Sequence, residues 1–157
     1  MAKVNYIIGD ATNPQIIGNK IIVHVCNDIG GWGKGFVMAI SKRWTQPEQQ
    51  YRQWFKSNDN FSLGQVQFVQ VEEEIWVANL IGQHKINKDE NGNAPIRYEA
   101  ILLGLEKVGQ FAFDKNATVH MPRIGCGLAG GTWDKVEPLI NKTLLEKKIE
   151  TYVYDFN

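Results

Sequence analysis

The amino-acid sequence predicts a three-layer α/β/α sandwich with a central mixed sheet. Short runs of β-branched and aromatic residues alternate with longer segments of helical periodicity. No internal repeat or low-complexity linker interrupts this alternation, and 157 residues fit one domain. We therefore expect a single domain over residues 1–157. The expected order is strand, strand, helix, helix, strand, strand, helix, strand, helix, strand.

The first four elements follow from short-range patterns. Val4–Ile8 is rich in β-branched and aromatic residues, and Gly9-Asp10 ends the predicted strand. Residues 21–26 are a nearly continuous run of β-formers, as expected for a strand buried on both faces. Apolar residues at helical spacing predict a helix over 36–44, and a second helix is predicted over 47–55, with a proline at its start.

The middle of the chain predicts a strand pair followed by a helix. Residues 65–71 alternate polar and apolar, but the phase flips, so we expect a bulge or two-sided burial near the end of that strand. Residues 75–80 form its predicted neighbour. The polar, glycine-containing segment 85–94 predicts an exposed loop. A helix is expected over 95–111, with Arg97 in solvent.

The last third of the chain predicts strand, loop, helix and strand again. Thr118–Met121 is the predicted strand, and residues 125–131 form a glycine-rich loop. Pro138 complicates the helix, so we expect a separate turn over 133–136 and a main helix from about Glu137. A strand over 151–154 closes the order. The second strand, the glycine loops and the last strand should meet at one sheet edge, where α/β folds bind ligands.

Composition excludes several classes of protein. The 17 Lys and Arg balance 17 Asp and Glu, so the net charge is zero and an extended basic face for nucleic acid is not expected. The two cysteines, Cys26 and Cys126, are too few and too far apart for a disulfide framework. Neither a signal-peptide pattern nor an apolar run of roughly 20 residues occurs. We expect a soluble cytoplasmic protein with no membrane partner.

Two glycine-rich loops each follow a predicted buried strand and precede a predicted helix. The first is Gly30-Gly31-Trp32-Gly33-Lys34-Gly35, and the second spans 125–131. Bare backbone N–H groups at a positive helix end bind anions, and two such loops facing one crevice would hold a diphosphate. The alternative is that these glycines only make tight turns.

Other phosphate-binding patterns compete with this interpretation. Gly125-x-Gly127-x-x-Gly130, followed 25 residues later by Asp155, matches a dinucleotide fingerprint. A doubly wound dinucleotide domain needs further strands after that acid, and the sequence ends at residue 157. Neither loop ends in the Gly-Lys-Ser or Gly-Lys-Thr of a P-loop, and neither cysteine is followed by the arginine of a cysteine-dependent phosphatase.

The histidines predict neither a metal nor a cofactor. His24, Cys26 and Cys126 would provide three zinc ligands, but no fourth is evident. His24 has only apolar neighbours and lies three residues before Asn27. It is therefore either a hydrogen-bonded core histidine or an active-site residue, and the sequence leaves both open.

In combination these residues resemble the macrodomain family, the ADP-ribose-binding module. Gly9-Asp10, Asn27, the loop 30–35 and Pro122-Arg123-Ile124-Gly125-Cys126-Gly127-Leu128 before Trp133 appear in the family's order. The resemblance covers essentially the whole chain. It looks nearest to the compact branch that includes the terminal ADP-ribose protein glycohydrolase and the yeast ADP-ribose 1''-phosphate phosphatase.

The resemblance implies a role for each part of the site. Asp10 would accept from the adenine amine, and Asp155 and Phe156 would lie beside the adenine, with Phe156 as a stacking ring. Asn27 would contact the distal ribose, and His24 matches a histidine linked to activity in phosphatase-like members. His24 and Asn27 are thus the candidate catalytic residues. The loops would bind the diphosphate through Gly31, Gly33, Gly35, Gly125, Cys126, Gly127, Leu128, Ala129 and Gly130.

The sequence departs from the glycohydrolase at two positions. Its catalytic lysine aligns with Gln83 and its catalytic aspartate with Ala129, and neither side chain can serve as a nucleophile or a base. The resemblance therefore implies a hydrolase of the ADP-ribose 1''-phosphate phosphatase type. The alternatives are a noncatalytic ADP-ribose reader and an O-acetyl-ADP-ribose deacylase. The expected partner is ADP-ribose, a derivative of it, or an ADP-ribosylated protein.

Overall fold

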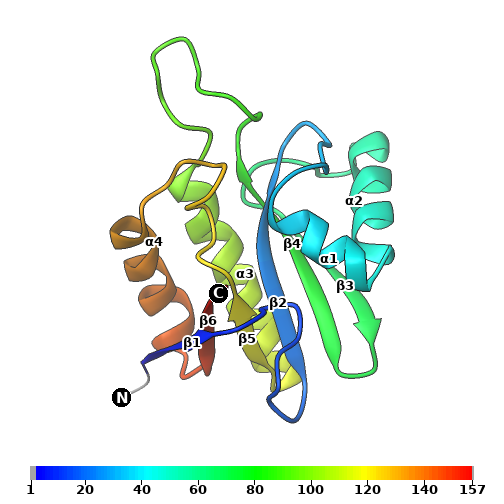
Figure 1. Ribbon diagram of the computed structural model, residues 1–157, viewed down its shortest axis with the longest axis vertical. Coiled ribbons are helices and arrows are strands. Elements are labelled where there is room, and N and C mark those ends of the chain that lie inside the picture. Colours follow the sequence, from blue (N-terminus) through cyan, green and yellow to red (C-terminus); the bar gives the residue numbers. More distant parts are fainter. Residues whose placement is uncertain (1–2, 157) are drawn as a thin grey trace.

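A computed structural model describes residues 3–156 as a sheet covered by helices on both faces (Figure 1). The strands are β1 (Val4–Ile8), β2 (Lys20–Asn27), β3 (Val66–Glu72), β4 (Ile75–Gln83), β5 (Thr118–Met121) and β6 (Thr151–Asp155), arranged in the order β1-β6-β5-β2-β4-β3. Only the β3–β4 pair is antiparallel among these strand pairs. The predicted mixed sheet is confirmed.

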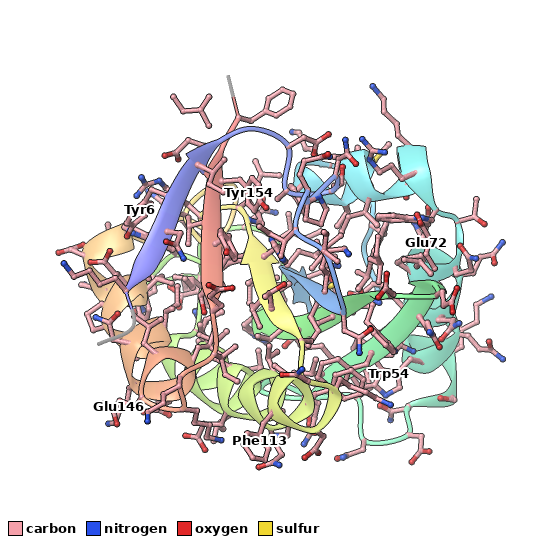
Figure 2. The ribbon with its side chains drawn as sticks, turned by 90° about the horizontal axis from the view of Figure 1, so that it is seen from below. Tyr6, Trp54, Glu72, Phe113, Glu146 and Tyr154 are labelled. Atoms are coloured by element: carbon pink, nitrogen blue, oxygen red, sulfur yellow. The ribbon has the colours of Figure 1, made fainter. Side chains whose placement is uncertain are left out.

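Two hydrophobic clusters on opposite faces of the sheet produce the three layers. Ile21 and Val23 of β2 pack in the cluster that contains α3 (Tyr98–Lys115) and α4 (Trp133–Ile140). Ile22 and Cys26 pack in the cluster that contains α1 (Phe36–Arg43) and α2 (Gln46–Ser57). Adjacent β2 side chains alternate between the two faces, as the pleat of a strand requires. Figure 2 shows the sheet between the two sets of helices.

Most predicted elements are confirmed within a few residues. The register between β3 and β4 shifts between Gln70 and Glu72, so the bulge expected near the end of β3 is present. The loop predicted over residues 85–94 is exposed over 85–93, and its last residue, Ala94, is half-buried. No helix within residues 3–156 combines the length and apolarity needed to cross a bilayer.

The start of α3 differs from the prediction because the residues before it form backbone hydrogen bonds with a neighbouring strand and loop. The N–H of Ile96 donates to Ala129 O, and the N–H of Arg97 donates to Gly82 O. These bonds keep residues 95–97 extended, and the helix begins at Tyr98. Arg97 is not fully solvated as expected: it is half-buried, and its Nη1 donates to the carbonyl oxygens of residues 94–96.

The prediction of a separate turn before Pro138 is wrong. One helix, α4, runs from Trp133 through Pro138 to Ile140, and a π-helical turn, η1 (Asn141–Leu145), follows it. Val136 and Ile140 are fully buried on the same face of this helix. Their packing outweighs the one intrahelical hydrogen bond that proline cannot make.

Candidate functional site

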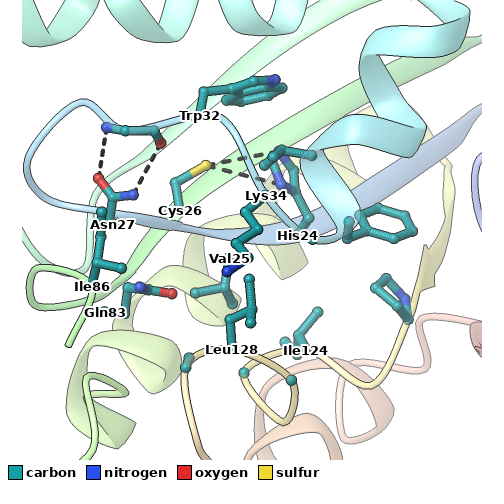
Figure 3. A pocket seen from close by; sticks show the side chains of 18 of the residues that line it. His24, Val25, Cys26, Asn27, Trp32, Lys34, Gln83, Ile86, Ile124 and Leu128 are labelled. Carbon is teal, nitrogen blue, oxygen red and sulfur yellow. Dashed lines mark hydrogen bonds between the residues drawn. The ribbon is translucent and has the colours of Figure 1, made fainter. Parts of the chain in front are cut away.

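The carboxyl ends of the parallel strands meet at one edge of the sheet, and two adjoining cavities lie there. The first, of about 760 Å³, is lined by both glycine loops and by Asn27; we call it the loop cavity (Figure 3). The second, of about 790 Å³, contains Asp10, and we call it the Asp10 cavity. Phe36, Pro122 and Arg123 line both, so these three residues mark the junction.

Asp10 has one carboxylate oxygen bound locally and the other beside a cation. Oδ1 accepts hydrogen bonds from the N–H of Thr12 at 2.9 Å and from its hydroxyl at 2.7 Å. Oδ2 lies 3.6 Å from Nη2 of Arg43. Burial raises the pKa of Asp10, but the Thr12 hydrogen bonds and the Arg43 charge outweigh it and bring that pKa below its usual value. Asp10 is therefore an ionised acceptor at neutral pH.

The far wall of the Asp10 cavity is aromatic. Tyr154 lines it, and the Tyr154 hydroxyl lies 2.8 Å from Nδ1 of the buried His120. Phe156 also lines this cavity and is 83% exposed. The stacking role that the resemblance implies for this exposed ring stays a prediction.

Arg123 contacts both the end of β6 and the start of α4 at the junction of the two cavities. Its Nε and Nη2 donate to the two carboxylate oxygens of Asp155 at 2.7 and 3.0 Å. Its guanidinium lies 5.1 Å from the ring centre of Tyr6 and 5.2 Å from that of Trp133. The hydrogen bonds from Arg123 lower the pKa of Asp155. Asp155 therefore stays ionised, and its charge is balanced by Arg123.

The first glycine loop is organised by Asn27. Oδ1 of Asn27 accepts from the N–H groups of Ile29 and Gly31 and from the hydroxyl of Tyr51, and Nδ2 donates to Gly31 O. These bonds hold the loop around the cavity. Gly31, Gly33 and Gly35 all line the cavity, and Gly35 has a φ of 86° that favours glycine.

The second glycine loop faces the first across the cavity. Gly125, Gly127, Leu128 and Ala129 line the cavity. A side-chain carbon placed on Gly35 would lie 3.1 Å from Cδ1 of Leu128, so the two loops approach closely at this point. The N–H of Gly130 donates to Gly127 O, and the thiol of Cys126 lies 3.5 Å from Ile124 O. Cys126 and Gly130 thus shape the loop, while their neighbours form the wall.

His24 lies on the α1 side of the sheet, where it is 1% exposed. Nδ2 of Asn79 donates to Pro47 O and to Gln67 Oε1, so Oδ1 of Asn79 faces His24 Nε2 at 2.5 Å. This arrangement places the ring proton on Nε2. Burial lowers the pKa of His24 to about 4, and its ring is neutral at pH 7. The free Nδ1 lies 4.0 Å from Sγ of Cys26.

Burial also keeps the Cys26 thiol protonated. Cys26 is 3% exposed, and burial raises the pKa of its thiol. A thiolate is the nucleophilic form of cysteine. His24 and Cys26 therefore form a packed, uncharged pair within the lining of the loop cavity, and the catalytic role that the resemblance implies for His24 stays a prediction.

Sequence reasoning gave no binding role to three residues at the site. Phe36 lies at the junction of the cavities, Lys34 lines the loop cavity, and Thr12 orients Asp10. Lys34 is the only charged residue in its loop, which is the signal that identifies it in the sequence. Thr12 and Phe36 have no such signal, because their importance depends on which strand ends are neighbours.

Comparison with known proteins identifies the family. A macrodomain protein from Streptomyces coelicolor, whose structure is solved, is 52% identical over 99% of this chain and 100% of its own, with a TM-score of 0.89. This chain belongs to the macrodomain family. A Bacteroides thetaiotaomicron protein of unknown function matches this macrodomain at 56% identity over 98% of both chains, with a TM-score of 0.97. No family model matches the sequence.

Two curated relatives of this macrodomain have different names. The mouse chromodomain-helicase-DNA-binding protein 1-like is 34% identical over 98% of this chain, which spans only 18% of that relative's length. A protein from Meyerozyma guilliermondii named ADP-ribose 1''-phosphate phosphatase is 24% identical over 90% of this chain and 94% of its own.

Proposed function

We propose that this macrodomain binds ADP-ribose across the two adjoining cavities. The observation that carries the proposal is the contrasting chemistry of these two cavities, which share Phe36, Pro122 and Arg123. The Asp10 cavity offers an ionised acceptor for an exocyclic amine beside the aromatic Tyr154 and Phe156. The loop cavity offers two backbone loops rich in glycine, which suit a diphosphate.

The orientation of the ligand follows from this contrast. The adenine lies beside Asp10, the diphosphate passes the junction at Phe36 and Pro122 and lies between the glycine loops, and the distal ribose lies farther into the loop cavity near Asn27. In this orientation Phe156 stacks on the adenine from the solvent side.

We further propose that the protein hydrolyses ADP-ribose 1''-phosphate to ADP-ribose and phosphate. The likeness to the Meyerozyma guilliermondii phosphatase over nearly the whole chain supports this reaction. A cationic lysine in the loop cavity, where the distal ribose is placed, supports a phosphorylated substrate.

A noncatalytic ADP-ribose reader is the second candidate, and the lining of the loop cavity favours it. Among the described residues that line this cavity none is an aspartate or a glutamate, and His24 is neutral and buried. A site of this kind binds its ligand without an evident general base.

Calorimetric titration with ADP-ribose, AMP and NAD tests the binding proposal. We expect ADP-ribose to bind more tightly than AMP, because AMP lacks the distal phosphate and ribose, and more tightly than NAD. NAD binding more tightly than ADP-ribose would support a dinucleotide site instead.

Product analysis tests the catalytic proposal on the same protein. Release of phosphate from ADP-ribose 1''-phosphate is the expected result. ADP-ribose binding without phosphate release would support the reader, and acetate release from O-acetyl-ADP-ribose would identify a deacylase. The matched control is Gly127→Glu, which puts a carboxylate into the loop cavity and should prevent binding of the anionic substrate. Phosphate release that persists in this variant would come from a contaminating phosphatase.

A further inference from the structure

The charged side chains are distributed unequally between the two cavities. Within the described lining of the loop cavity, the side chains charged at neutral pH are those of Lys34 and Arg123, both cations. The Asp10 cavity is lined by two carboxylates, Asp10 and Asp155, and by the cations Lys42, Arg43 and Arg123. Carboxylates thus offset much of the positive charge in the Asp10 cavity, whereas no carboxylate within the described lining of the loop cavity does so, and the loop cavity suits an anionic group.

Arg123 already forms an ion pair and contacts two aromatic rings. Both oxygens of Asp155 accept from its guanidinium, which also lies against the rings of Tyr6 and Trp133. Its charge is balanced, and its planar group is held at the β6 side of the junction. A new anion in the loop cavity would have to compete with Asp155 for this arginine.

Lys34 forms no such ion pair within the described residues. No ion pair within residues 3–156 includes Lys34, and its side chain is exposed between Gly33 and Gly35. Figure 3 shows the side chain extending from the first glycine loop into the cavity. An ammonium group on a flexible stem is a compact charge that suits a phosphoryl group.

The position of Lys34 along the crevice indicates which phosphoryl group it contacts. Phe36 and Arg123 line both cavities, whereas Lys34 lines only the loop cavity, together with Asn27 and Gln83. A ligand with its adenine at Asp10 passes its diphosphate through the junction and places its distal ribose beyond it. Lys34 is thus on the distal side.

We infer that Lys34 recognises a phosphoryl group on the distal ribose and selects ADP-ribose derivatives that carry one over ADP-ribose itself. This inference rests on the proposed binding of ADP-ribose. It makes Lys34 a specificity-determining residue, with a role separate from that of the backbone loops that hold the diphosphate.

The test uses a ligand that cannot be hydrolysed. In the 1''-methylenephosphonate of ADP-ribose, a CH₂ group replaces the bridging oxygen. Calorimetry measures its affinity and that of ADP-ribose for the wild type, Lys34→Gln, Lys34→Arg and the control Lys107→Gln. Lys107 is exposed on α3 and lines neither described cavity, so its variant removes one charge elsewhere.

The wild type is expected to bind the phosphonate up to about fivefold more tightly than ADP-ribose, since a solvent-exposed ion pair contributes modestly. Lys34→Gln should abolish that preference, with a much larger loss of affinity for the phosphonate than for ADP-ribose. Lys34→Arg and Lys107→Gln should retain the preference.

Two results would overturn the inference while the proposed function stands. Equal wild-type affinity for the two compounds would show that no phosphoryl group on the distal ribose is recognised. An equal loss of affinity for both compounds in Lys34→Gln would place Lys34 on the diphosphate that they share. Failure of the folded wild type to bind either compound would instead remove the proposed function itself.

Discussion

Asp10→Asn is a sharp test of where the adenine binds. The two Thr12 donors require an acceptor at the position of Oδ1. An asparagine in the same place keeps its own Oδ1 there and turns Nδ2 toward Arg43 and the cavity. The substitution therefore preserves the local fold and replaces an acceptor by a donor where the adenine amine is expected.

The expected loss can be estimated from the exposure of this carboxylate. A hydrogen bond to a charged group contributes about 1.5–3 kcal/mol, and the Asp10 side chain is 38% exposed, so we take the lower end. This predicts ADP-ribose binding about tenfold weaker in calorimetry. AMP should lose affinity by the same factor, because it contains the same adenine.

The control is Asp114→Asn on α3, an exposed aspartate that accepts from Gln110 and lines neither described cavity. It should leave both affinities unchanged. Unaltered ADP-ribose affinity in folded Asp10→Asn would refute the placement of the adenine. A loss for ADP-ribose but not for AMP would refute it too, because Asp10 would then contact another part of the ligand.

Four further outcomes are expected. A side-chain carbon on Gly127 meets no atom within 4 Å, so Gly127→Glu should keep its thermal stability yet lose ADP-ribose binding in calorimetry. His24→Gln should keep phosphate release within a few-fold of wild type, and a loss of roughly 10²–10⁴-fold with intact affinity would make His24 a catalytic acid or base. With Gln83 and Ala129 at the aligned positions, mass spectrometry should find no covalent ADP-ribosyl-lysine adduct, and Ala129→Asp alone should not create one. Burial lowers the pKa of His24 to about 4, and burial together with the charge of Lys20 lowers the pKa of His120 to about 3. Both side chains titrate near 6.5 in the unfolded chain. The unfolding free energy measured in urea should therefore decrease as the pH drops below 6.5, by up to about 1.4 kcal/mol per pH unit for each histidine.

The order of elements could be predicted because local patterns agree with the final fold. The β-formers of 21–26 and the helical spacing of 36–44 correspond to β2 and α1 within one residue. The start of α3 and the course of α4 could not be predicted in the same way. They depend on bonds to Gly82 and Ala129 and on the burial of Val136, which are contacts between distant parts of the chain.

In the candidate site, too, features with a local sequence signal could be predicted and contacts that depend on the fold could not. The glycine loops and the acid after β1 have local signals, and the structure brings them to one edge of the sheet. The hydrogen-bond partners and orientations of the side chains at the site had no such signal. The sequence places Asn27 and His24 near the site, but it does not show that Asn27 bonds to its own loop or that His24 faces α1.

The protonation states at the loop cavity lead to a last prediction, on the pH dependence of hydrolysis. Burial places the pKa of His24 near 4 and raises that of Cys26, so neither group titrates between about pH 5 and 8. The second pKa of a phosphate monoester is about 6. A change of kcat for ADP-ribose 1''-phosphate near that pH should therefore belong to the substrate, and His24→Gln should show the same profile. An inflection that disappears in His24→Gln would contradict this assignment and show that His24 titrates in the enzyme–substrate complex.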